Sequence, residues 1–408
     1  MSAKKKSQNL IARLKYGSGK NSSTQLTRII NEAKEVFGKQ FFNAKQFYVP
    51  SYGGPYVLNL IGKERKQEIF ASEQNSMYNN YTMEMLEDTD IKMNLFVDDY
   101  ENGEIEGLDG SLPTNTLSNT AYEIKIGNWK KIVYPTIIKR TNVKLNLDKQ
   151  VWVLPTKWWF SDKEELVEFR KLLKTIGFKK IIILPTDTFK DEGIPYLECC
   201  AIFCEKDYSG PITVETRKGT TYQYNYSDKD VYYFGDNSAE TDILYRCLEL
   251  NDPYHWETPK NPDLYKSQAR KRNEYYSKKT NGTTIKVVDL IQKNGLQIEE
   301  INESEVSDKK NINTYRLALT TLPGGTNYGQ GLGYVQIFEP GMVGTTKHRV
   351  AVLKGVKSMK EAKKHLDYLL KIGENIKNKT SDSPTINRPQ MKAVLKKDTY
   401  EREFGKIK

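Results

Sequence analysis

The chain has 408 residues, of which 38% are hydrophobic and 11% aromatic, so it is long enough for two or three domains and too apolar for a disordered protein. Lys and Arg outnumber Asp and Glu by 63 to 52, and the net charge of +11 favours a polyanionic partner such as nucleic acid. An AT-rich genome also produces Lys- and Asn-rich proteins, so charge alone does not establish such a partner.

Two further features bear on where the protein works. The basic start lacks an apolar segment and no window of about 18 apolar residues occurs, so we expect neither export nor a membrane span. The few cysteines are clustered, and only three histidines accompany them, which favours core thiols over disulfides or zinc. We therefore expect no metal site and a cytoplasmic protein, bacterial or encoded by a phage. The cysteines are Cys199, Cys200, Cys204 and Cys247.

The first part of the chain alternates between helix and strand patterns. After a basic arm over residues 1–22, apolar residues recur at helical spacing over residues 23–37. Segments typical of a strand, a glycine turn, a helix and further strands follow as far as residue 99. This alternation predicts an α/β domain over residues 23–211.

Residues 151–206 are the most organised stretch. A short apolar strand over residues 151–155 precedes Ser161 and Glu164, whose spacing predicts a capping box and a helix that Gly177 ends. The β-branched run over residues 179–185 predicts a strand buried on both faces, as in parallel sheets. This order of strand, helix and strand predicts a β-α-β crossover unit.

A third strand and a change of character follow. The apolar run over residues 196–204 predicts a buried strand, which the long acidic turn before it allows to run antiparallel at the sheet edge. From residue 212 the sequence becomes alternating and tyrosine-rich, so we expect a second domain over residues 212–385, with a well-capped helix from Ser358 to about residue 376. A Lys-rich tail covers residues 386–408.

On these residues the chain resembles a known family. The stretch "VWVLP", a capped helix, "IIILP", "TFKDEGIP" and a closing apolar strand resemble the second half of the catalytic domain of N6-adenine DNA methyltransferases from restriction-modification systems. The resemblance implies a Rossmann-like S-adenosylmethionine methyltransferase sheet, followed by a mixed α+β domain that recognises the DNA target. Within this sheet, the first half would bind the cofactor and the second half would hold a flipped adenine.

The resemblance also implies a cofactor site. The family holds S-adenosylmethionine with a Gly-rich loop and an acidic residue about 20 positions later, and Gly53, Gly54 and Glu73 match that spacing. Tyr52 and Pro55 depart from the pattern, and a bulky loop would obstruct the cofactor. Cofactor binding and a purely structural turn therefore both remain open.

The catalytic motif of the family is Asn or Asp, two prolines, then Tyr or Phe, which grips the adenine amino group and stacks on the base. The expected window, "EGLDGSLPTNTLSNTAYE", does not contain this tetrapeptide. Weak candidates are Asp109, and Asp252 with Tyr254 in "NDPY", where an ordinary turn is the simpler interpretation. Tyr196 is a candidate base-stacking platform, or an aromatic that closes the sheet edge.

Basic residues of the second domain are candidates for DNA contact. The stretch "YKSQARKRNEYYSKK" interleaves cations with tyrosines, an arrangement suited to phosphates and bases, although a solvated helix would also explain it. The Gly-rich segment over residues 329–334 favours a hairpin or a recognition loop. Trp158, Trp159 and Phe160 would line a ligand pocket or pack in the core. The candidate DNA-binding residues are Lys266, Arg270, Lys271, Arg272, Tyr275, Lys278, Lys347 and Arg349.

Three hypotheses follow. The first is a protein that binds double-stranded DNA and whose methyltransferase centre has degenerated, acting alone or with a second methyltransferase-type subunit. The second is an active S-adenosylmethionine-dependent adenine methyltransferase with divergent motifs. The third is an interaction or structural protein that retains the sheet.

Overall fold

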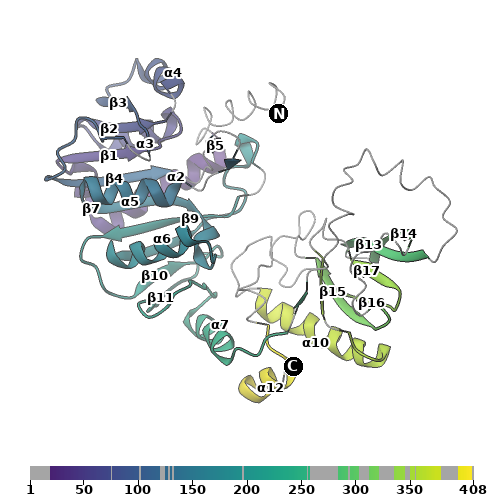
Figure 1. Ribbon diagram of the computed structural model, residues 1–408. Coiled ribbons are helices and arrows are strands. Elements are labelled where there is room, and N and C mark those ends of the chain that lie inside the picture. Colours follow the sequence, from purple (N-terminus) through teal and green to yellow (C-terminus); the bar gives the residue numbers. More distant parts are fainter. Residues whose placement is uncertain are drawn as a thin grey trace. The chain divides into compact units, whose positions relative to one another are not determined.

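In the computed structural model, the chain forms two compact units, unit 1 (Met1–Tyr232) and unit 2 (Tyr233–Lys408) (Figure 1). The structure describes residues 19–74, 76–100, 103–119, 125–126, 129–130, 133–194, 197–254, 256–257, 284–292, 295–302, 312–320, 335–344, 350–353, 355–377 and 394–406.

Unit 1 is built on one nine-stranded sheet with the order β11-β10-β8-β9-β7-β4-β1-β2-β3. All neighbouring pairs from β3 to β7 are parallel, β9 is antiparallel to β7 and β8, and the hairpin strand β11 is antiparallel to β10. This large, mostly parallel sheet confirms the Rossmann-like α/β fold. The strands are β1 (Gln46–Pro50), β2 (Ile69–Glu73), β3 (Met93–Val97), β4 (Pro113–Asn119), β7 (Asn146–Pro155), β8 (Phe178–Ile183), β9 (Cys199–Glu205), β10 (Ile212–Glu215) and β11 (Thr221–Tyr224).

The position of β9 corrects one expectation. The strand is antiparallel, as the acidic turn before it allowed, but it lies between β7 and β8 and not at the sheet edge. Six of its seven residues are buried, including Cys199, Cys200 and Cys204. A strand so apolar needs neighbours on both sides, because an edge position would leave part of its surface in water.

Helices cover both faces of the sheet (Figure 1). On one face, α2 (Lys20–Phe37), α3 (Pro55–Glu64) and α4 (Ser76–Leu86) share a core with alternate residues of the central strands. On the other face, α5 (Tyr134–Lys144) packs on β7, and α6 (Glu164–Thr175) packs on β8. Short elements complete the unit: η1 (Lys39–Asn43), η2 (Thr156–Trp159), η3 (Lys190–Glu192), and the strand pair β5 (Lys125–Ile126) and β6 (Trp129–Lys130).

The start of α6 differs from the prediction, whereas its end agrees with it. The helix begins at Glu164 with Lys163 as its N-cap residue and without a side-chain cap, so Ser161 lies two residues before the cap position. The Ser161 hydroxyl accepts from Lys163 N–H at 3.4 Å, and its carbonyl accepts from Arg170 Nη1 at 2.9 Å. The predicted capping box therefore does not form. Gly177 follows the last turn with φ of +76°, the conformation expected of a glycine that ends a helix.

The second domain was expected from residue 212, but the units divide after Tyr232. Strands β10 and β11 extend the large sheet, since β10 pairs with β8. The tyrosine-rich segment after them also belongs to unit 1: the rings of Trp158 and Tyr232 lie 5.3 Å apart, centroid to centroid. The alternating pattern thus continues the first sheet and does not open a new domain.

Unit 2 contains two small sheets, one with the order β12-β18-β15-β16 and one with the order β14-β13-β17. Helix α10 (Met359–Lys377) packs on β15 and β16, and Ser358 Oγ accepts a hydrogen bond from Glu361 N–H at 3.2 Å, which confirms the predicted cap. None of the helices described in either unit combines the length and apolar character needed to cross a bilayer. The other elements are α7 (Ser238–Leu250), β12 (Trp256–Glu257), β13 (Thr284–Gln292), β14 (Gly295–Asn302), β15 (Arg316–Thr320), β16 (Val335–Phe338), β17 (Met342–Gly344), β18 (Val350–Leu353) and α12 (Lys397–Phe404).

Candidate functional site at the switch point of the large sheet

The strand order changes direction between β1 and β4. From β1 the chain continues through α3 to β2 on one side, and from β4 it continues through α5 to β7 on the other. The connections leave toward opposite faces, so the carboxyl ends of β1 and β4 flank the place where open α/β sheets bind ligands. Chemistry carried by this unit is expected there.

The loop from β1 to α3 is folded tightly at this point. Ser51 and Gly53 have positive φ values of 51° and 75°, and Pro55 is the first residue of α3. All five residues from Ser51 to Pro55 are buried. The backbone of this loop therefore faces other parts of the chain and not solvent.

Glu73, at the end of β2, lies against this loop. Its side-chain oxygens accept hydrogen bonds from the backbone N–H of Gly53 at 3.2 Å and from that of Gln74 at 2.9 Å. The structure thus brings together Gly53 and Glu73, which the sequence placed 20 residues apart. The third predicted residue, Gly54, is extended with φ of 170°, a conformation open to any residue.

Tyr52 was expected to obstruct the cofactor loop, but its side chain turns into the core. It is fully buried, and its hydroxyl donates a hydrogen bond to Asn79 Oδ1 of α4 at 2.6 Å. Burial raises the pKa of Tyr52, so it remains a neutral donor. This hydrogen bond ties the β1–α3 loop to α4.

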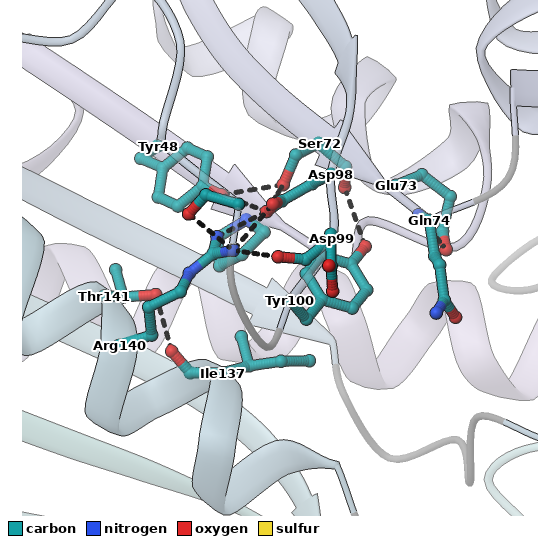
Figure 2. Close-up of polar contacts among 12 residues, drawn as sticks. Tyr48, Ser72, Glu73, Gln74, Asp98, Asp99, Tyr100, Ile137, Arg140 and Thr141 are labelled. Carbon is teal, nitrogen blue, oxygen red and sulfur yellow. Dashed lines mark hydrogen bonds and ion pairs between the residues drawn. The ribbon is translucent and has the colours of Figure 1, made fainter. Parts of the chain in front are cut away.

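Asp98, directly after β3, is held by a charged partner from α5 (Figure 2). Arg140 Nη1 donates to Asp98 Oδ1 at 2.6 Å, Arg140 Nη2 donates to Asp98 Oδ2, and both side chains are buried. Tyr48 and Ser72 donate to the same Oδ2 at 3.3 and 3.2 Å. Burial by itself would lower the pKa of Arg140, but the hydrogen bond and charge of Asp98 outweigh it and raise that pKa.

This Asp98 network fills one face of the sheet beside the switch point. The hydroxyls of Tyr48 and Ser72 lie 2.7 Å apart, and Arg140 Nη1 also donates to the Asp99 carbonyl at 2.7 Å. Burial raises the pKa of Tyr48, with the negative charge of Asp98 as the next cause. Sequence reasoning did not single out these residues, because Asp98 and Arg140 are 42 positions apart and neither belongs to a motif.

Asn119 is the last residue of β4 and is buried beside the switch point. The residue before it, Ser118, donates its hydroxyl hydrogen bond to the Pro50 carbonyl of β1, which fixes the end of β4 against the end of β1. Sequence reasoning missed Asn119, because it searched for a complete motif with both prolines. A signal was available in Tyr122, because the family motif ends in an aromatic residue three positions after its Asn or Asp. Tyr122 itself lies outside the described residues.

The catalytic candidate Asp109 lies at the amino ends of β1 and β4, opposite the carboxyl ends that flank the switch point. It sits in the turn before β4, where its N–H donates to Gln46 Oε1 at the start of β1, at 2.8 Å. Its carboxylate accepts hydrogen bonds from Ser111, which lower the pKa of Asp109. Since this is the amino end of β1 and β4, Asp109 cannot reach a ligand at their carboxyl ends.

The other catalytic candidates belong to unit 2 and have structural contacts there. Asp252 accepts hydrogen bonds from Lys396 and from Thr399 of α12, and these contacts lower its pKa. The Tyr254 hydroxyl lies 3.0 Å from His365 Nδ1. The segment with Asp252 and Tyr254 follows α7, and Asp252 ties it to α12.

The remaining predictions divide between core residues and undescribed ones. Trp158 is fully buried, with the Phe169 ring at 5.6 Å between centroids, so the aromatic cluster packs in the core beneath α6. The stacking candidate Tyr196 lies outside the described residues. So do all the candidate DNA contacts, which stay predictions: Lys266, Arg270, Lys271, Arg272, Tyr275, Lys278, Lys347 and Arg349.

Comparison with known proteins finds similarity in structure only. No family model matches the chain, and no curated protein matches it. A type I restriction-modification system methyltransferase subunit from Streptococcus thermophilus is 14% identical with a TM-score of 0.36, over 45% of each chain. The type IIG restriction endonuclease BpuSI is 7% identical with a TM-score of 0.40, over 90% of this chain and 57% of that one. The 23S rRNA methyltransferase ErmE is 9% identical with a TM-score of 0.29, over 42% and 67%.

The similarity to these structures is a similarity of fold. The chain spans about half the length of the restriction-modification subunits that it matches. The matched structures carry the names of a restriction-modification subunit and of an rRNA methyltransferase.

Proposed function

We propose that this protein binds double-stranded DNA and is related in architecture to N6-adenine DNA methyltransferases, but does not transfer methyl groups. The observation that carries the proposal is the burial of the whole β1–α3 loop, Ser51 to Pro55, within the chain itself. A cofactor held by this loop would need its backbone exposed on one side. Binding S-adenosylmethionine would therefore require the contacts around the loop to open.

The chemistry around the loop does not fit the cofactor either. Pro55 has no backbone N–H, so the start of α3 offers one donor fewer to a ligand. Glu73 is engaged by the loop itself, through Gly53 N–H. Asp98, a second carboxylate at the carboxyl ends of these strands, is paired with Arg140. Glu73 and Asp98 therefore hold the protein together through these contacts.

The proposal of DNA binding rests on charge. Residues 233–408 carry 30 Lys and Arg against 22 Asp and Glu, so they hold +8 of the net charge of +11. The predicted contacts Arg270, Lys271 and Arg272 belong to this part of the chain. Phosphate contacts of this kind release counterions, so the affinity should fall steeply with salt.

Two measurements on the full chain test the proposal. Calorimetric titration with S-adenosylmethionine should give no binding heat, whereas a mobility shift with duplex DNA should show salt-sensitive binding. Replacing Arg270, Lys271 and Arg272 with Ala should reduce the salt slope by up to about three. The matched control replaces Lys163, Lys171 and Lys174, exposed residues around α6, and should leave the slope unchanged.

Each outcome discriminates between hypotheses. Cofactor uptake would contradict the loss of methyl transfer. DNA binding with an unchanged slope in the triple variant would remove that stretch from the DNA surface. Absence of both DNA and cofactor binding would leave an interaction protein that retains the sheet.

A second candidate function, an active adenine methyltransferase, is favoured by the place of Asn119. This residue ends β4 at the switch point, and Tyr122 follows at the spacing of the outer positions of the family motif. If the enzyme is active, transfer of a labelled methyl group to duplex DNA should be lost in Asn119→Ala. The control Asp109→Ala should keep it, because Asp109 lies at the opposite edge. No transfer by the unmodified chain would eliminate this candidate.

A further inference from the structure

Strand β3 is one of the two edge strands of the nine-stranded sheet among the described residues, and β11 is the other. Lys92 O accepts from Ile69 N–H at 2.8 Å, and Asp98 N–H donates to Glu73 O at 3.0 Å, so even-numbered residues turn their backbone groups toward β2. In a parallel ladder the alternate residues turn theirs away. Met93, Leu95 and Val97 therefore present N–H and C=O groups on the outer edge.

A groove runs beside this edge. A cavity of about 430 Å³ lies between β3 and α4, and its lining includes Asn79, Met83, Met93, Leu95 and Val97. Met83 and Val97 are each 52% exposed. The lining also contains the polar side chains of Glu68, Ser76, Asn80 and Asn94, so a partner would meet apolar and polar groups together. Methionine adapts its shape to different partners.

The charge around the edge is opposite to that of the whole protein. Residues 84–97, from the end of α4 through β3, contain four Asp and Glu and a single Lys, in a chain with a net charge of +11. Glu84, Glu87, Asp88 and Asp90 are exposed beside the groove residues of α4 and β3. This acidic edge repels nucleic acid, and it would repel the same edge of a second copy. A cationic segment would complement it.

We propose that β3 is a docking edge for an extended segment of another polypeptide, in which Lys or Arg alternates with apolar residues. The segment adds to the sheet as a further strand through the outer groups of Met93, Leu95 and Val97, and its apolar side chains enter the groove against Met83. Main-chain hydrogen bonds provide affinity, and the groove and the acidic rim select the sequence. This inference does not depend on the proposed function, because neither cofactor nor DNA takes part.

The test uses the full chain and an array of nine-residue peptides with Lys or Arg at odd positions and varied apolar residues at even positions. Binding is measured by fluorescence anisotropy. We expect a subset to bind, their Glu-containing counterparts not to bind, and affinity to weaken as salt rises. N-methylation of alternate peptide nitrogens should abolish binding in one register and not in the other.

Variants locate the binding edge. Met83→Lys should weaken peptide binding at least tenfold, and the control Val143→Lys, at a 75% exposed position on α5, should leave it unchanged. Both lysines are on helix surfaces, and a fluorescence melt checks the fold of each variant. Failure of every peptide, or equal binding by both variants, would overturn the proposal. So would a dimer seen by light scattering that Met83→Lys dissociates, because the edge would then serve a second copy.

Discussion

The two halves of the large sheet are filled in different ways. From β7 to β11 the interior is apolar, with Trp152, Ile181 and Cys200 fully buried on one face. From β1 to β4 the equivalent face carries the Asp98 network, in which a buried ion pair is surrounded by hydroxyls. The first kind of interior tolerates changes that conserve volume, whereas the second depends on every polar group keeping its partner.

The largest expected effect breaks the polar half. Arg140→Leu leaves the Asp98 charge buried without its partner, which should lower the free energy of unfolding by about 3–5 kcal/mol. The double variant with Asp98→Asn should recover much of this loss. Denaturant titration with tryptophan fluorescence measures both, since four of the five tryptophans lie in residues 1–232. Equal stability of Arg140→Leu and the unmodified chain would show that the pair contributes nothing.

The next effect concerns the apolar half. Gly177→Ala should cost more than about 2 kcal/mol, because the left-handed conformation itself costs about 1–2 kcal/mol in a residue with a Cβ and this Cβ would lie 1.9 Å from the Glu205 carbonyl oxygen. The control Gly193→Ala has φ of +80° with no neighbour within 4 Å of its Cβ, so it should incur the conformational cost alone. Equal losses in the two variants would contradict the clash.

Alkaline pH should also act on the apolar half. Burial raises the pKa of Cys199 to about 12 from an ordinary 9.0, and it raises those of Cys200 and Cys204 as well. Because the folded pKa exceeds the unfolded one, this stability is complete below about pH 9 and is lost as the pH rises toward the folded pKa. Denaturant titrations from pH 8 to 11 should show the decline. Replacing the three cysteines with Ala should flatten it up to about pH 10, above which the buried tyrosines Tyr48 and Tyr52, whose ordinary pKa is 10.0, also contribute.

The smallest effect is expected at the surface of the polar half. Lys144 pairs with the exposed Glu104 at 2.6 Å, and the hydrogen bond from Lys144 lowers the pKa of Glu104. Lys144→Ala should leave the unfolding transition unchanged, because an exposed ion pair gains little over its contacts with water. In the variant, an NMR titration should show the Glu104 pKa rising toward its ordinary value. A clear loss of stability would mean that Lys144 supports α5 in another way.

The same contrast explains what sequence reasoning could predict. The β-branched run of β8 and the apolar run of β9 predicted buried strands, because a continuous apolar segment needs cover whatever its neighbours are. The Asp98 network depends on the approach of Arg140 from a helix 42 residues away, and no local pattern records that approach. Local pattern also failed at Ser161, because the helix begins two residues later with Lys163 at the cap position, and succeeded at Ser358.

The site shows the same limit. Spacing correctly paired Gly53 with Glu73, because a strand, a turn and a helix of ordinary lengths set that distance along the chain. Burial of the loop was not predictable, since it depends on parts of the chain that pack over it. Asn119 was missed because its significance lies in its place at the end of β4, which a search for a complete motif does not see.

The place of β9 has a consequence for synthesis on the ribosome. This strand is made after β8 but inserts between β7 and β8, so the two earlier strands cannot pair with each other in the finished arrangement. Until residues 199–205 emerge, the nascent sheet has a gap one strand wide, for roughly 1–4 s at about 5–20 residues per second. A nascent chain stalled within that gap would expose two unsatisfied strand edges to chaperones and to other nascent chains.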